Sequence, residues 1–111
     1  MNDQAIERGI QAKVLTAPHV TPADIEANIN SEFSFTVGDA ARALDCTVSD
    51  AVDLLTICVL TLKNGFTVVG ESACASPENF DAELGRLIAR QNAVDKVWPL
   101  MGYALKKKLA A

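Results

Sequence analysis

The clearest pattern in the chain is a pair of apolar, β-branched runs on either side of Asn64 and Gly65. An Asn-Gly pair tolerates the positive φ angles of a type I′ turn, so the stretch LLTICVLTLKNGFTVVGESAC predicts an antiparallel β-hairpin. If Asn64 and Gly65 are the two turn residues, Leu60 lies opposite Val69.

This register gives the hairpin two apolar faces. It also places Glu71 opposite Cys58, where a carboxylate needs a partner such as Arg86 or Arg90. We therefore expect helices on one face and either the N-terminal segment or another subunit on the other. The run SEFSFTV (residues 31–37) is a candidate third strand. One predicted face carries Ile57, Val59, Phe66 and Val68, and the other carries Cys58, Leu60, Leu62 and Val69.

A short helix is predicted to begin at Pro22. Thr21 is a good N-cap, Pro22 suits the first helical position, and Asp24 stands where a capping-box acid reaches back to the cap. Ile25 and Ile29 are spaced to form one buried stripe.

The stretch FTVGDAARALDCTVSDAVDLL predicts two further short helices around a turn at residues 45–47. Their spacing resembles a helix-turn-helix, and with the hairpin as a wing it leaves a nucleic-acid-binding, winged-helix-like arrangement as the alternative function. The second helix (residues 48–55) would enter the major groove, yet it carries Asp50 and Asp53 and no base. Plain packing helices are therefore favoured.

The longest helix is predicted to begin at Pro77 behind a capping Ser76. Because proline removes a hydrogen bond and crowds the preceding turn, Pro99 predicts a stop or kink at Trp98. A last helix (residues 100–109) then closes with three lysines, which suit a helix C-terminus. The apolar stripe of the main helix comprises Phe80, Leu84, Leu87, Ile88, Gln91, Val94 and Trp98.

These elements predict a single α+β domain over residues 20–111, preceded by a loosely held N-terminal arm (residues 1–19). No apolar run approaches the roughly 20 residues that cross a bilayer, and the N-terminus lacks a secretion signal. We therefore expect no membrane partner and a location in the host cell cytoplasm. In that reducing compartment Cys46, Cys58 and Cys74 are expected to stay thiols and to be small buried hydrophobes.

The net charge of -4 is divided unevenly along the 111 residues. Residues 1–54 carry nine acids and three bases, whereas residues 55–111 carry five acids and seven bases. An acidic chain does not suit general nucleic-acid binding, which depends on neutralising phosphates, although a basic face on the second half is compatible with these numbers.

The sequence offers no recognisable catalytic or metal chemistry. His19 is the single histidine, and it lies in the arm, far along the chain from Cys58 and Cys74. A lone histidine with scattered cysteines does not form a metal-ligand pattern, and no phosphate-binding loop is present. We therefore expect a non-enzymatic protein without a cofactor.

The best candidate binding group lies on the main helix. Arg86 and Arg90 are four residues apart and share a helix face, Lys96 follows, and Trp98 and Tyr103 flank the predicted kink. Guanidinium and aromatic groups together can hold an anionic small molecule or an acidic host protein. The alternative is a solvated helix face with Trp98 in the core.

The stretch from LTICVLTLKNGFTVVGESAC to the C-terminal lysines, together with VTPADIEANINSEFSFTV, resembles a bacteriophage and prophage protein family represented by N4 gene product 49 and Sf6 gene 66. The connector ARALDCTVSDAVD and residues 1–19 match that family poorly. The resemblance implies a small phage accessory protein and identifies no catalytic residue. We expect it to bind a host factor or sequester a signalling ligand, as in counter-defence or host takeover. Because both predicted hairpin faces are apolar and a small domain has few helices to cover them, we also expect a homo-oligomer.

Overall fold

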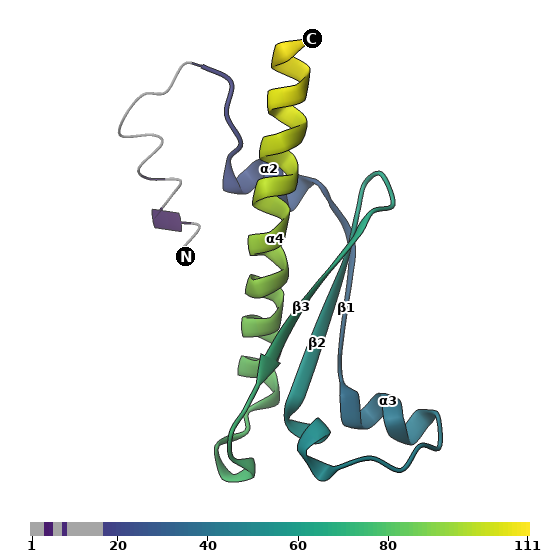
Figure 1. Cartoon of the computed structure of the whole chain (residues 1–111). Coiled ribbons are helices and arrows are strands. Elements are labelled where there is room, and N and C mark those ends of the chain that lie inside the picture. Colours follow the sequence, from purple (N-terminus) through teal and green to yellow (C-terminus); the bar gives the residue numbers. More distant parts are fainter. Residues whose placement is uncertain (1–3, 6–7, 9–16) are drawn as a thin grey trace.

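The chain forms a three-stranded antiparallel sheet with one long helix across a single face, as the computed structural model shows (Figure 1). This confirms the predicted α+β class. The structure describes Gln4, Ala5, Arg8 and residues 17–111, so most of the predicted arm lies outside the described residues. In chain order the elements are α2 (Pro22–Ala27), β1 (Ile29–Thr36), α3 (Val37–Ala43), a 3-10 helix (Asp50–Leu54), β2 (Leu55–Leu62), β3 (Thr67–Ala73), a second 3-10 helix (Pro77–Asn79) and α4 (Ala82–Ala110).

Helix α2 begins where the capping box predicts. The Thr21 hydroxyl accepts the Asp24 N–H at 3.1 Å, and the Asp24 carboxylate accepts the Thr21 N–H at 3.0 Å. Ile25 is fully buried. The prediction that Ile29 extends this helix was wrong, because the helix ends at Ala27 and Ile29 opens β1.

The sheet has the order β1-β2-β3, which confirms SEFSFTV as a third strand up to Thr36, whereas Val37 begins α3. The hairpin of β2 and β3 is also confirmed, but its predicted register was wrong by one residue. The Leu62 N–H bonds to the Phe66 carbonyl at 2.8 Å, so three residues rather than two form the loop. Only Gly65 in this loop has a positive φ, +88°, and the Asn64 side chain instead accepts the Phe66 N–H. A three-residue loop needs only one left-handed residue, whereas a type I′ turn needs two.

The one-residue shift exchanges the faces of β3, because neighbouring side chains on a strand point to opposite sides. Cys58 lies opposite Gly70, and Glu71 lies opposite Ile57. Glu71 is thus an exposed residue on the outer face, not a carboxylate among apolar groups. The inner face carries Thr56, Cys58, Leu60, Leu62, Val68 and Gly70, whereas the outer face carries Phe33, Phe35, Ile57, Val59, Val69 and Glu71.

Helix α4 begins five residues later than predicted. Ser76 does not cap it but donates its hydroxyl hydrogen to the Glu78 carboxylate beside the 3-10 helix of Pro77–Asn79. The cap is Asp81, whose carboxylate accepts two main-chain N–H groups of the first turn at 3.0 and 3.1 Å. A negative group at this end also interacts favourably with the helix dipole.

The predicted break at Trp98 was wrong, because α4 continues through Pro99 to Ala110 as one helix. Pro99 is exposed, so water can reach the carbonyl whose helix bond it removes. Val97 and Met101, on either side of the proline, pack against the core and hold both halves of the helix.

Helix α4 is longer than the sheet that it covers. Its 29 residues span about 43 Å, whereas an eight-residue strand spans about 26 Å. Roughly three turns therefore extend past the sheet, next to α2 (Figure 1).

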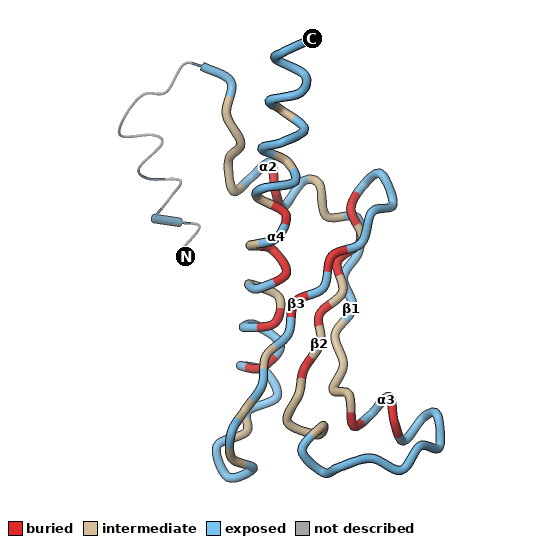
Figure 2. Tube along the Cα trace, in the orientation of Figure 1, coloured by how far each residue is buried: buried red, intermediate tan, exposed pale blue. Residues whose placement is uncertain are grey.

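The contact face of α4 is a row of small residues. Gly85, Ala89, Ala93 and Val97 follow one another at intervals of four and are all buried, and the buried segments of α4 and of the sheet appear together in Figure 2. The approach is closest at Gly70, where a Cβ atom would lie 2.2 Å from both the Ala89 oxygen and the Ala93 nitrogen. The helix main chain therefore lies directly against β3.

This packing corrects the predicted apolar stripe of the main helix. Leu84, Leu87 and Ile88 were expected to be core residues, yet they are 52%, 60% and 43% exposed. A large side chain at the contact would hold the helix away from Gly70. The small residues, which the sequence pattern had not singled out, form the packing surface instead.

We predict that Gly70→Ala destabilises the protein by roughly 1–3 kcal/mol, because the added methyl group meets rigid main chain. Gly102→Ala is the matched control, since a Cβ at Gly102 meets nothing within 4 Å. In an exposed helix interior that change should raise stability by about 1 kcal/mol. Urea unfolding of both variants gives the comparison. Equal loss of stability in the two variants would contradict the close contact.

Candidate functional site

The five residues predicted to bind a ligand do not converge on one site. They all lie on α4, where each residue turns about 100° from the last, so Lys96 and Tyr103 point away from the face of Arg86 and Arg90. Arg86 and Tyr103 are also separated by about 25 Å along the helix axis. Both are exposed, and neither forms a hydrogen bond or ion pair within the described part of the chain.

Arg90 forms structural ion pairs with carboxylates of two other elements. Its Nη2 lies 2.8 Å from the Glu26 carboxylate, and its Nε lies 3.0 Å from that of Glu32. These hydrogen bonds, foremost that with Glu26, raise the pKa of the Arg90 guanidinium above its usual value. Arg90 thereby ties α2 and β1 to α4, and its partners are these two carboxylates rather than Glu71.

Lys96 also has a structural contact. Its ammonium group donates to the Val69 carbonyl at 2.5 Å, and Asn92, one turn earlier, donates to the Glu71 carbonyl at 2.7 Å. Both carbonyls belong to the outer edge of β3. The two side chains therefore cover an edge that would otherwise offer unpaired carbonyls to another strand.

Trp98 lies partly in the core. Its side chain packs against the buried cluster of α4 and the sheet, and its indole N–H is buried without an acceptor in the described structure. This location agrees with the expectation of a core tryptophan beside a solvated helix face.

The region predicted to resemble a helix-turn-helix contains only one α-helix. Its second helix is a five-residue 3-10 turn (Asp50–Leu54), and Arg42 of α3 is bound to Asp39 at 2.7 Å and to Asp53 at 2.8 Å. The hydrogen bond from Arg42 lowers the pKa of Asp39. A winged-helix arrangement therefore lacks its recognition helix in this structure.

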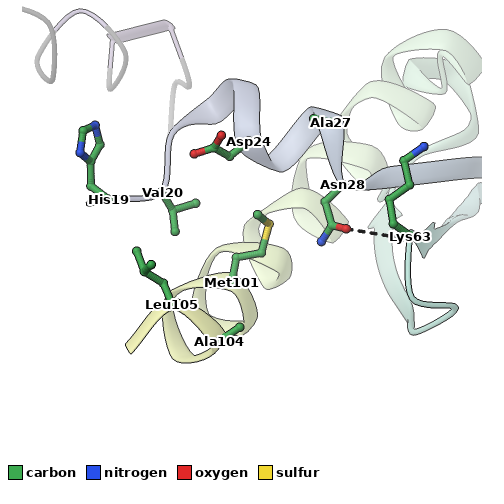
Figure 3. Close-up of a pocket in the computed structure, with 9 residues that line it drawn as sticks. All are labelled: His19, Val20, Asp24, Ala27, Asn28, Lys63, Met101, Ala104 and Leu105. Carbon is green, nitrogen blue, oxygen red and sulfur yellow. Dashed lines mark hydrogen bonds between the residues drawn. The ribbon is translucent and has the colours of Figure 1, made fainter. Parts of the chain in front are cut away.

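A different site lies where the last turns of α4 extend beyond the end of the sheet. There α2, the segment before it and the last turns of α4 enclose an open trough of about 500 Å³ (Figure 3). Its polar groups are largely bonded already: Asp24 serves the capping box, and the Asn28 side-chain oxygen accepts the Lys63 N–H at 3.4 Å. The lining consists of His19, Val20, Asp24, Ala27, Asn28, Lys63, Met101, Ala104 and Leu105.

A second depression of about 220 Å³ adjoins this trough and shares Asn28, Met101 and Ala104 with it. It reaches the hairpin tip, where Phe66 is 54% exposed. We call the two depressions together the end surface. The remaining residues of the second depression are Leu62, Asn64, Phe66 and Leu100.

Little in the sequence predicts the end surface. Val20 stands just before the N-cap of α2, where an apolar residue often packs on the first turns of a helix, and this was the one local signal. The surface depends on α4 continuing past Pro99, which sequence rules argue against.

The described residues bring together no recognisable catalytic or metal-binding group of side chains. The structure gathers no cluster of histidine, cysteine or carboxylate side chains that could hold a metal ion there. Cys58 is buried, Cys74 is partly buried and Cys46 is exposed, so the expectation of three buried thiols holds fully for Cys58 alone. None of the described helices is long and apolar enough to cross a membrane.

We predict that Arg90→Gln lowers the free energy of unfolding by about 1 kcal/mol, because two ion pairs that join α2 and β1 to α4 are lost. Arg86→Gln on the same helix face removes an unpaired surface charge and should change stability by less than about 0.5 kcal/mol. Thermal melts of the two variants provide the test. If Arg86→Gln cost as much as Arg90→Gln, the structural role assigned to Arg90 would be wrong.

The comparisons with known proteins agree with the resemblance seen in the sequence. The model of the family described as phage protein (N4 Gp49/phage Sf6 gene 66) matches residues 20–109, which include every described helix and strand from α2 to nearly the end of α4. No curated protein and no solved structure matches the chain. The match covers well over half of the chain, and the protein therefore belongs to the phage protein (N4 Gp49/phage Sf6 gene 66) family.

Proposed function

We propose that this phage protein is a non-enzymatic binding protein that engages a host protein through its end surface. The observation that supports the proposal is the open, apolar trough between α2 and the projecting turns of α4. Family membership supports the phage setting, and the choice of a host partner is our inference from that setting.

The shape of the end surface favours a protein over a small molecule. Small-molecule sites usually enclose most of their ligand, whereas this trough is wide open to solvent. Apolar side chains such as Met101 and Leu105 line it, and the Asp24 carboxylate and Asn28 side-chain oxygen already accept main-chain N–H groups. A partner would therefore contribute apolar side chains to fill it.

The charges around the end surface favour an acidic partner. Lys106, Lys107 and Lys108 are exposed on the last turns of α4, and Lys63 lies on the rim of the trough. Opposite charge on a partner speeds association and selects among partners, and both effects weaken with salt. Binding should therefore weaken as the salt concentration rises.

An anionic small molecule is a weaker candidate on this geometry. Such a ligand needs several converging cationic donors. Arg90 is held by two carboxylates, Lys96 is bound to main chain, and Arg86 stands alone on its turn of α4. The sequence prediction of a five-residue binding group thus gives way to the end surface in our proposal.

We predict that Ala104→Glu abolishes host-protein binding while leaving the fold intact, because Ala104 is exposed and lines both depressions. Ala110→Glu is the matched control: it makes the same change near the same lysines but outside both depressions. Tagged protein from infected cells would be captured with its partner, and the affinity of the purified pair then measured for each variant.

The expected result is a loss of affinity of at least about tenfold for Ala104→Glu and little change for Ala110→Glu. Circular dichroism on the same samples shows whether both variants are folded. Equal affinity of the two variants would remove the end surface as the binding site. Failure of the native protein to retain any host protein would remove the proposed function itself.

A further inference from the structure

The two edges of the sheet are treated differently by the rest of the fold. At β3, the outward carbonyls of Val69 and Glu71 are already bonded to α4 side chains. At β1, the other edge, no described segment forms a further strand. One edge is thus covered by the helix, and the other is available.

The main-chain groups that β1 presents follow from the register. The Lys63 N–H bonds to the Asn28 carbonyl, which fixes the odd-numbered residues of β2 as those that face β1. Phe33 and Phe35 lie opposite odd-numbered residues of β2 and bond inward. The N–H and C=O groups of Glu32, Ser34 and Thr36 therefore point outward from the sheet.

We propose that β1 pairs antiparallel with β1 of a second copy of this chain, around a two-fold axis at Ser34. The two three-stranded sheets then form one six-stranded sheet. This inference does not depend on the proposed function, because the end surface and the β1 edge are different parts of the molecule.

The register of this pairing is limited by the strand itself. Hydrogen-bonded pairs in an antiparallel ladder join residues whose main-chain groups face each other, so the even-numbered residues must pair. An irregularity between Ile29 and Ser31 ends the regular edge at Ser31, and α3 begins after Thr36. An axis at Ser34 pairs Ser34 of one copy with Ser34 of the other, and Glu32 of each copy with Thr36 of the other. These pairs all lie within the regular part of the edge.

The side chains in this register are compatible with a second copy. On the outer face, Phe33 of each copy lies opposite Phe35 of the other, and such aromatic pairs stabilise strand pairing. Phe33 is 64% exposed in the single chain, and its ring centre lies 5.3 Å from that of Phe35. The pairing would produce one row of four aromatic rings.

The charge on β1 does not oppose the pairing. Glu32 carries the strand's single charge, and its carboxylate is already bound to Arg90 at 3.0 Å. In the proposed register the two Glu32 residues are about 13 Å apart along the strands. Like-charge repulsion across the axis is therefore small. This neutral, self-complementary edge favours a second copy over a strand of another protein.

The test is cross-linking in the full chain with two native cysteines replaced: Cys46, which is exposed, by serine, and Cys58, which lies opposite Ser34 on β2 and would compete for it, by alanine. Residues of a hydrogen-bonded antiparallel pair have Cα atoms about 5.5 Å apart, within the range that a disulfide spans. Mild oxidation of Ser34→Cys should therefore give a covalent dimer. Ser31→Cys is the matched control, because its two copies would be about 20 Å apart.

A second variant tests the main-chain pairing itself. Ser34→Pro removes an N–H that faces outward and bonds to nothing inside the sheet, and proline is tolerated on such an edge. Light scattering should show a dimer for the native chain and a monomer for this variant at the same concentration. The dissociation constant of the dimer should rise by at least about tenfold in the variant. Circular dichroism checks that the variant is folded.

Three results would overturn the proposal. A native chain that stays monomeric at high micromolar concentration would show that β1 does not pair with a second copy. A dimer that persists in Ser34→Pro would use another surface. Equal cross-linking of Ser34→Cys and Ser31→Cys would show that contact between copies is not in this register.

Discussion

The rest of the structure depends on the contact between the main chain of α4 and β3 at Gly70. A side chain at that position would lie within 2.2 Å of helix main chain, so the contact is possible only without one. Ala89 and Ala93, on the helix, are likewise small and fully buried. Close packing of this kind maximises dispersion contacts between rigid elements and tolerates little change in volume.

The same contact determines what remains uncovered. Because α4 lies close to β3, Asn92 and Lys96 reach past the strand and bond to its outward carbonyls, which closes that edge of the sheet. The helix covers only one face, so Phe33 and Val69 on the other stay exposed. Its last turns pass beyond the sheet and form the end surface with α2. The edge of β1 and the end surface are thus both consequences of one helix packing on one face.

Local signals predicted much of the fold. The capping box of Thr21, the flanking β-branched runs and the alternation in SEFSFTV each act within a few residues, and each identified its element correctly. The hairpin register failed because Asn-Gly fits a two-residue turn and a three-residue loop alike, and only the tertiary contact of Gly70 with α4 separates them.

The candidate site was harder to predict, because it depends on contacts between distant segments. Arg90 was predicted to bind a ligand, but it instead binds Glu26 and Glu32, which are about sixty residues away in the sequence. Pro99 argued for a helix break that packing on both sides of it overrides. The end surface exists because of that continuation, so no pattern of single residues could reveal it.

Residue-by-residue amide hydrogen exchange tests most directly the claim that β1 is the edge left for a second copy. Along this strand we predict an alternation: the N–H groups of Phe33 and Phe35 exchange slowly at every protein concentration, because they bond to β2. Those of Glu32 and Ser34 should exchange rapidly in dilute protein and slowly in concentrated protein, where pairs of chains form. Rapid exchange of Ser34 at all concentrations, or slow exchange of Ser34 in dilute protein, would contradict the account.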